Sequence, residues 1–348
     1  MRFPGFEGEW KEKRIGELLV IGSGKDYKHL QTGDIPVFGT GGYMTSVNKY
    51  LHDGETICIG RKGTINKPFY YNGKIWTVDT LFYTHSFKNL IPRFCFNLFE
   101  KINWLHFNEA SGVPSLSKST IENIEVNIPE ESEQKKIAAF LKKIEERIET
   151  QNKIIEELKL LKSTLCDQLL EAHKGLLFKI SDIANIGRGR VISSREISNQ
   201  KNPLYPVYSS QTSNNGIMGY LDEFDFEGEY ITWTTDGANA GTVFHRNGKF
   251  NCTNVCGVLK IKDTKLFNPG FVALALQRQT KKYVSTNLAN PKLMNNVMSG
   301  ITLNLPQIEI QNKISKLNQG IDAKIMNELK LMTNLLIQKK YLLDKLFK

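Results

Sequence analysis

The sequence predicts an α+β protein with an internal pseudo-two-fold duplication, in which two β-rich units are separated by two long antiparallel helices that form a coiled coil. Three observations predict this fold class: a long internal repeat, strand-like runs in the first part of each copy, and a helical apolar pattern in the second part. The expected segments are a β-rich unit at 1–128, a helix at 129–174, a second β-rich unit at 175–304 and a second helix at 305–348.

The repeat is clearest where each helix is expected to begin. The stretch "IPEESEQKKIAAFL" at 128–141 is matched by "LPQIEIQNKISKL" at 305–317. Pro129, Gln134 and Ile137 recur 177 positions later, as Pro306, Gln311 and Ile314. Such a long period indicates a duplicated domain, because the units of solenoid repeats are several times shorter.

The first part of each copy is rich in Gly, Thr, Tyr, Phe and Val, in short runs such as "ETICIG" and "EYITWTT". Such runs predict strands and hairpins. The Asn-Gly pairs at 72–73 and 247–248 predict tight turns, because Asn and Gly tolerate the positive φ that two-residue hairpin loops require.

The second part of each copy has apolar residues at alternating steps of four and three, the spacing of a coiled-coil seam. We expect the following seam residues to form the spacer and partner interface: Ile137, Leu141, Ile144, Ile148, Gln151, Ile155, Leu158, Ile314, Ile321, Ile325, Glu328, Met332 and Leu335. Polar residues fall at matched positions, Gln151 with Glu328 and Lys162 with Lys339, and such residues set register. The alternative for either helix is packing on the core of its own domain.

Charge and cysteine content give weaker constraints. The net charge of +10 at pH 7 suits a polyanionic partner, although many other proteins share it. Five cysteines without framework spacing, no signal peptide and no long apolar span predict a cytoplasmic protein. Cys252 and Cys256 lack the further ligands of a tetrahedral zinc site, so we expect no metal.

The junction Pro-x4-Gln-x2-Ile occurs twice, at the heads of two paired helices that each follow a β-rich unit. This pattern, with "RFPGFEGEWKEKRIGEL" at the start and "GVPSLSKSTIENIEV" before the first helix, resembles the specificity subunit of type I restriction-modification systems over essentially the whole chain. The resemblance implies two target recognition domains on two spacer helices, and a subunit that is not itself a catalyst.

The resemblance also implies partners. These would be double-stranded DNA with a split target, two methyltransferase subunits and two restriction-translocase subunits. No cofactor is expected for this chain, because S-adenosylmethionine, ATP and Mg would be used by the partner subunits.

Candidate DNA contacts lie in loops of both β-rich units. Arg and Lys can bind guanine O6 and N7 or phosphates, Asn can pair with adenine, and Asp can accept from cytosine. The candidates are Thr40, Arg61, Lys62, Thr64 and Lys67 in the first unit and Arg188, Arg190, Ser209, Ser210, Gln211, Thr235, Asp236, Asn239 and Arg246 in the second. Without the resemblance, the loop 59–67 would be interpreted as an exposed hairpin tip, and Asp236-Gly237 as a simple turn.

Two other classes of function compete with this interpretation. An enzyme is disfavoured: "NPLY" at 202–205 approaches the Asn-Pro-Pro-Tyr motif of amino-methyltransferases, but Leu204 replaces the second proline, and the glycines of "FGTGG" at 38–42 have the wrong spacing for a cofactor loop. A coiled-coil adaptor with two β-rich protein-binding modules would explain the helices but not the repeated junction or the basic charge. DNA binding discriminates between the adaptor and the specificity subunit.

Overall fold

The structure is a computed structural model that describes residues 2–173, 175–285 and 290–347. It divides into two compact units: unit 1 is Met1–Lys153 with Leu329–Lys348, and unit 2 is Ile154–Glu328. Lys174 and Lys348, the last residues of the two expected helical segments, lie outside the described residues.

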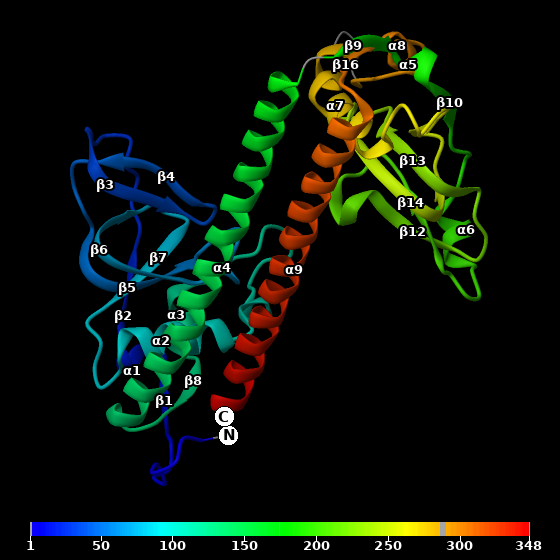
Figure 1. Cartoon of the computed structure of the whole chain (residues 1–348). Coiled ribbons are helices and arrows are strands. Elements are labelled where there is room, and N and C mark those ends of the chain that lie inside the picture. Colours follow the sequence, from blue (N-terminus) through cyan, green and yellow to red (C-terminus); the bar gives the residue numbers. More distant parts are fainter. Residues whose placement is uncertain (1, 174, 286–289, 348) are drawn as a thin grey trace. The chain divides into compact units, whose positions relative to one another are not determined.

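Both units combine a β-rich body with parts of two long helices, α4 and α9 (Figure 1). The elements up to the first long helix are β1 (Lys11–Arg14), α1 (Ile15–Leu18), β2 (Val20–Ser23), β3 (Thr32–Gly39), β4 (Gly42–Val47), β5 (His52–Gly60), β6 (Phe69–Thr77), β7 (Leu81–His85), α2 (Pro92–Lys101), η1 (Trp104–Phe107), α3 (Lys118–Glu122), β8 (Glu125–Ile128) and α4 (Glu131–Ala172). The elements that follow are β9 (Leu176–Lys179), α5 (Ile180–Ile183), β10 (Ala184–Arg188), α6 (Ser194–Ser198), β11 (Tyr205–Tyr208), η2 (Ser213–Gly216), β12 (Ile217–Leu221), β13 (Phe226–Thr234), β14 (Val243–Cys252), β15 (Cys256–Ile261), α7 (Pro269–Gln279), η3 (Thr280–Tyr283), α8 (Asn295–Gly300), β16 (Thr302–Leu305) and α9 (Ile308–Leu346).

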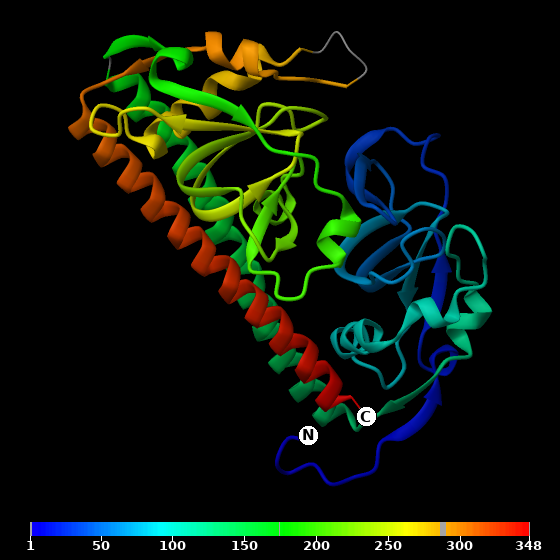
Figure 2. The ribbon, with the colours of Figure 1, turned by 90° about the vertical axis from the view of Figure 1, so that its right-hand side faces the viewer.

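The two β-rich bodies have the same topology, which confirms the predicted duplication. Each contains a six-stranded sheet, with the order β2-β7-β5-β6-β3-β4 in unit 1 and β10-β15-β13-β14-β11-β12 in unit 2. In both sheets one pair is parallel, β3 with β6 and β11 with β14, and the other pairs are antiparallel. A second, two-stranded sheet leads into each long helix: β1 with β8 before α4, and β9 with β16 before α9 (Figure 2).

The prediction of tight turns at the two Asn-Gly pairs is wrong. Gly73 lies inside β6, directly opposite Gly54 of β5, and Gly248 lies inside β14, opposite Gly228 of β13. All four glycines have positive φ, between 102° and 127°. Both strands of each pair therefore adopt, at one shared position, a conformation open only to glycine, and pairing continues on either side.

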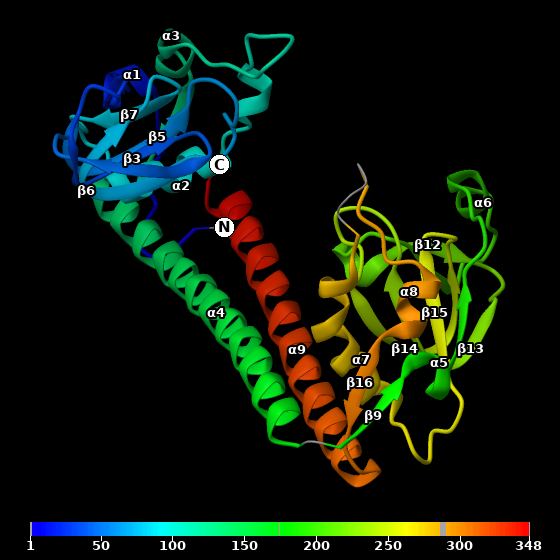
Figure 3. The same cartoon turned by 90° about the horizontal axis from the view of Figure 1, so that it is seen from above.

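Each unit has one main hydrophobic core, and the long helices contribute to it. In unit 1, Ile137, Leu141 and Ile144 of α4 join Leu342 and Leu343 of α9 in the same buried cluster as the β-rich body. Figure 3 shows the corresponding layer of unit 2, where α7 lies between the sheet and α9. Each long helix thus packs both on the other long helix and on the core of the unit. The coiled-coil pairing and the packing on a domain core, which the sequence analysis gave as alternatives, therefore occur at the same time.

The long helices run in opposite directions within each unit. In unit 2, the Lys162 ammonium lies 2.5 Å from an Asp322 carboxylate oxygen, and the Cys166 thiol lies 3.5 Å from Asn318 Oδ1. From Lys162 to Cys166 the chain advances four residues along α4, while the partner position on α9 moves back four residues, from Asp322 to Asn318. The two helices are therefore antiparallel here. In unit 1, Lys339 of α9 lies 3.0 Å from a carboxylate oxygen of Glu145 on α4.

The matched lysines of the sequence therefore occupy equivalent positions: each pairs with an acid of the other helix. Because partly buried ion pairs contribute little net stability but penalise other alignments, we expect these two pairs to set the register. All the predicted seam residues are buried or half-buried.

All five cysteines are buried free thiols. Cys58 lies in β5 and Cys95 in α2, both without exposed surface. Burial raises the pKa of each of these two thiols above the ordinary value of a cysteine, because a thiolate would be poorly solvated in the protein interior.

The glutamine of the repeated junction connects the long helix to the β-rich body. Gln134 is 1% exposed, at the start of α4. Its Oε1 accepts a hydrogen bond from the Ile91 amide (2.9 Å), and its Nε2 donates to the carbonyls of Asn89 and Pro129 (both 3.0 Å). Ile91 is the residue before the first turn of α2, so one side chain links the starts of two helices.

Gln311 repeats this arrangement at the start of α9. Its Oε1 accepts from the Asn268 amide (2.9 Å), and its Nε2 donates to the carbonyls of Leu266 (3.2 Å) and Pro306 (2.7 Å). Asn268 precedes α7 as Ile91 precedes α2. The junction motif therefore recurs because each copy needs a buried amide that satisfies three backbone groups.

We expect Gln134→Leu and Gln311→Leu each to destabilise its own unit by on the order of 2–3 kcal/mol, since buried backbone groups would lose their partners. Gln338→Leu on the exposed face of α9 is the control and should change stability by less than about 0.5 kcal/mol. Urea denaturation, with hydrogen exchange at the Ile91 and Asn268 amides, measures both effects. Equal stability of the junction and control variants would contradict the role assigned to the glutamines.

Candidate nucleic-acid interface

In unit 1, the loop after β5 is held by backbone hydrogen bonds to the segment before α3. The Gly63 amide donates to the Pro114 carbonyl (2.8 Å), and the Leu116 amide donates to the Arg61 carbonyl (2.9 Å). Between these bonds Lys62 pairs with Ser115 as a β-bridge. The side chains of Arg61 and Lys62 are consequently exposed while the backbone that carries them is fixed.

Unit 2 has the same arrangement after β13. The Gly237 amide donates to the Pro291 carbonyl (3.0 Å), and the Leu293 amide donates to the Thr235 carbonyl (2.9 Å). Asp236 and Lys292 form the bridge. We call the bridge, its loop and the paired segment the bridge site of each unit, comprising 61–64 with 109–118 in unit 1, and 235–242 with 285 and 290–295 in unit 2.

The glycine of each bridge site has the same backbone conformation, with φ +94° at Gly63 and +90° at Gly237. Because this region is open mainly to glycine, it explains why "KG" and "DG" occur at corresponding positions. The bridge pairs differ in chemistry: Lys62 faces Ser115, whereas Asp236 faces Lys292, with a carboxylate oxygen 3.6 Å from the ammonium. One backbone thus presents two different sets of donors and acceptors.

The structure brings most of the predicted residues of unit 1 together. Thr40 lies in the turn between β3 and β4, and its Oγ1 is 3.5 Å from the point that a Cβ on Gly63 would occupy. Thr40 therefore lies next to the loop that carries Arg61, Lys62 and Thr64. Lys67 is exposed further along the same loop.

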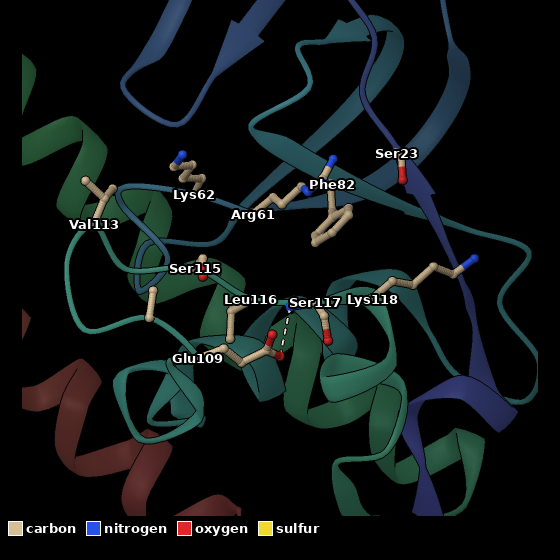
Figure 4. A pocket seen from close by; sticks show the side chains of 11 residues that line it. Ser23, Arg61, Lys62, Phe82, Glu109, Val113, Ser115, Leu116, Ser117 and Lys118 are labelled. Carbon is tan, nitrogen blue, oxygen red and sulfur yellow. Dashed lines mark hydrogen bonds between the residues drawn. The ribbon is translucent and has the colours of Figure 1, made fainter.

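A pocket of about 670 Å³ lies beside the bridge of unit 1. It is lined by the loop, by residues of β2 and β7, and by the segment 109–118 (Figure 4). Among its lining residues, Glu109, Ser117 and Lys118 were not predicted to contact DNA. The sequence holds one indication of this segment: "VPSL" at 113–116 corresponds to "NPKL" at 290–293 in the second copy, and these stretches include the bridge residues Ser115 and Lys292.

The two predicted arginines of β10 and its following segment have different partners. The Arg188 guanidinium is exposed and lies 3.5 Å from the Met294 sulfur. Arg190 lies between two carboxylates, with Glu196 at 2.7 Å and Asp225 at 3.1 Å. The hydrogen bond to Glu196 raises the pKa of Arg190, and both carboxylates compete with a phosphate for this side chain.

Two predicted contacts of unit 2 are buried. Thr235 has no exposed surface, and its hydroxyl donates to Asp236 (2.6 Å). Arg246 is 4% exposed: its guanidinium lies over the ring of Tyr208 at 3.6 Å and donates to the Asn215 carbonyl at 2.9 Å. Burial lowers the pKa of Arg246. These side chains support the loops of the interface and are covered by protein, so neither belongs to the proposed DNA contacts.

The remaining predicted residues of unit 2 lie in two loops. Asn239 is exposed in the bridge-site loop. Ser209, Ser210 and Gln211 are half-buried between β11 and η2, where the Ser209 hydroxyl lies 3.0 Å from that of Thr253 and Gln211 Nε2 donates to the Ile217 carbonyl.

Within residues 2–173, 175–285 and 290–347, no group of three or more His, Cys, Asp or Glu side chains could hold a metal ion. None of the helices in this part of the chain has the length and apolarity to cross a membrane.

Two copies of one scaffold with different surface chemistry define a modular recognition protein. A family model, the type I restriction modification DNA specificity domain, matches residues 7–160 and 177–338. The chain belongs to this family and carries two copies of its domain, which confirms the resemblance stated from the sequence.

Known relatives agree with this assignment. A provisionally named type I specificity subunit of Mycoplasma pneumoniae is 36% identical over 64% of this chain and 84% of its own length. The N-terminus of another, from the same organism, is 49% identical over 40% of this chain and 73% of its own length. The crystal structure of a type I S subunit from M. genitalium has the same fold, with a TM-score of 0.72 over 99% of this chain and 97% of that one, at 18% identity.

Exposed and buried arginines of unit 2 should differ in their effect on DNA binding. We expect Arg188→Met to flatten the dependence of log K on log salt by about one unit, because one phosphate contact is lost, and Arg246→Met to leave that slope unchanged. Binding of a DNA duplex across a salt series measures both. An equal change in slope for the two variants would contradict the buried role of Arg246.

Proposed function

We propose that this chain is the subunit that reads a split DNA target and directs adenine methylation or ATP-dependent restriction by its partner subunits. The observation that carries the proposal is the pair of bridge sites, which share a backbone and differ in side chains. Phosphate contacts position a protein on DNA, whereas base contacts specify sequence, so different side chains on one scaffold suit two different half-sites. Residues 1–128 and 175–304 would be the target recognition domains.

In this proposal the chain binds and positions, and its partners carry out the chemistry. Two methyltransferase subunits would supply S-adenosylmethionine-dependent methylation, and two restriction-translocase subunits would use ATP and Mg. The exposed groups of the bridge sites are hydrogen-bond donors and acceptors suited to base edges and phosphates, and the net charge of +10 favours DNA over the protein ligands of an adaptor.

The long helices would act as the spacer between the two half-sites. Helix α4 has 42 residues, which corresponds to a length of about 63 Å. Expected spacer segments are 129–174 and 305–348, and the ion pairs of Lys162 and Lys339 support a single register for them.

Mapping methylated adenines in host DNA with and without this gene tests the proposal. We expect a split motif whose methylation requires the gene. Replacing 179–304 with the equivalent unit of a relative should alter one half of the motif only, because each unit reads through its own bridge site. A change in both halves, or a motif that does not depend on the gene, would overturn the proposal.

The seam should be needed for assembly. Ile144 is 7% exposed in the core of unit 1, and Ile144→Asp would place a carboxylate there at a cost of several kcal/mol. We expect this variant, and Ile321→Asp in unit 2, to lose copurification with methyltransferase subunits. Asn152→Asp adds the same charge on the exposed face of α4 and should copurify normally. Normal assembly and unchanged methylation by the Ile144 variant would contradict the role of the seam.

A further inference from the structure

The pocket beside the bridge of unit 1 combines opposite charges. Arg61, Lys62 and Lys118 line it together with one carboxylate, Glu109. Figure 4 shows Arg61 and Lys62 on one side of the pocket and Glu109 with Ser117 on the other. A carboxylate at a DNA-binding surface repels phosphates, so its presence there requires a particular reason.

The Glu109 carboxylate is held in place through one of its two oxygens. Oε1 accepts from the Ser117 amide (3.0 Å) and from the Thr120 hydroxyl. Thr120 first, and then the hydroxyl and the amide of Ser117, lower the pKa of Glu109 and keep it ionised. The structure records no hydrogen bond to Oε2 among the described residues, so this oxygen is available as an acceptor.

The Glu109 backbone is fixed as well, because its amide donates to the Ser115 carbonyl at 3.1 Å. Ser115 is the bridge partner of Lys62. The carboxylate is therefore tied through the bridge to the loop that carries Arg61, and acceptor and cation are positioned by the same short piece of sheet.

Arg61 is the fork-shaped donor of this pocket. Its guanidinium carbon lies 5.9 Å from the centre of the Phe82 ring. Among the described residues its side chain forms one hydrogen bond, to the Asp79 carbonyl, and this bond is long at 3.5 Å. No carboxylate among the described residues forms a salt bridge with it. Its paired donors can therefore bind the adjacent O6 and N7 acceptors of guanine, the geometry that a guanidinium matches best.

We propose that this pocket reads one G·C base pair through its major-groove edge, with Arg61 donating to guanine O6 and N7 and Glu109 Oε2 accepting from the cytosine N4 amino group. The inference rests on the proposed function and deepens it, since it assigns a base pair to the half-site of unit 1. A carboxylate is the acceptor that the cytosine amino group prefers, and it discriminates against thymine, which presents an oxygen at that position.

Unit 2 provides an internal comparison. The Ser285 amide donates to the Lys292 carbonyl at 2.9 Å, as Glu109 donates to Ser115, so Ser285 occupies the place of Glu109. Thr235, which is buried, occupies the place of Arg61. The two matching positions of unit 2 therefore carry neither the guanidinium nor the carboxylate, and the same base pair should not be read by Thr235 and Ser285.

The competing role for Glu109 is structural, because Ser117 and Thr120 belong to the start of α3. Glu109→Gln separates the two roles. The amide retains an oxygen that can accept from Ser117 and Thr120, but it replaces the second oxygen with an NH₂ donor, which cannot accept from cytosine.

The test measures binding of the complex with its methyltransferase subunits to the methylated motif and to every single-base-pair variant of it. We expect Glu109→Gln to reduce the preference for one G·C pair by on the order of 10- to 100-fold, and Arg61→Lys to relax that same pair. Glu12→Gln, which removes one negative charge from exposed β1, and Ser285→Ala, which alters the matching position of unit 2, should leave the preference at that pair unchanged.

Two outcomes overturn the inference: an unchanged base preference in the Glu109 variant, or relaxation of different base pairs by the Glu109 and Arg61 variants. Both leave the proposed function standing, provided that the wild-type complex still discriminates its motif. Absence of any sequence preference in the wild-type complex would instead overturn the proposed function. Thermal unfolding of each variant identifies a purely structural effect, which would weaken binding to all sequences alike.

Discussion

The arrangement of each unit depends on one buried glutamine amide. Gln134 and Gln311 each satisfy three backbone groups: one belongs to the proline just before the long helix, and two belong to the segment before α2 in unit 1 or before α7 in unit 2. Because all the partners are backbone atoms, the connection places no demand on the side chains around it. The rest of the body can change in sequence while its attachment to the long helix is preserved.

The bridge sites separate scaffold from chemistry in the same way. Backbone hydrogen bonds and a glycine with positive φ fix the conformation of each loop. The side chains at the bridge therefore contribute little to the stability of the loop. Lys62 and Asp236 can therefore occupy equivalent positions despite opposite charge. The backbone of each bridge site loses its conformational entropy when the protein folds. Less conformational entropy therefore remains to be lost when the side chains bind a ligand.

The sequence predicted the fold well because the duplication, the strand-like runs and the seam are all repeating patterns. Such patterns can be recognised in a single sequence, without knowledge of tertiary contacts. The Asn247-Gly248 pair led to a wrong prediction of a turn. Two neighbouring residues cannot distinguish a hairpin turn from a strand in which a glycine lies opposite a glycine of the partner strand. The burial of Arg246 and the pairing of Glu109 with the bridge depend on contacts between residues far apart in the chain. A residue's charge and loop context indicate what it could bind but do not show which neighbours already cover it.

Labelling of the buried cysteines can report local unfolding of unit 1. Cys58 lies two residues before the end of β5, next to the loop of the bridge site, and Cys95 lies in the helix that Gln134 holds in place. Both thiols are inaccessible and poorly ionised in the closed fold, so an alkylating reagent can reach them only through fluctuations that unpack unit 1. Their labelling rate would therefore distinguish a ligand that rigidifies the interior of this unit from one that merely covers its surface.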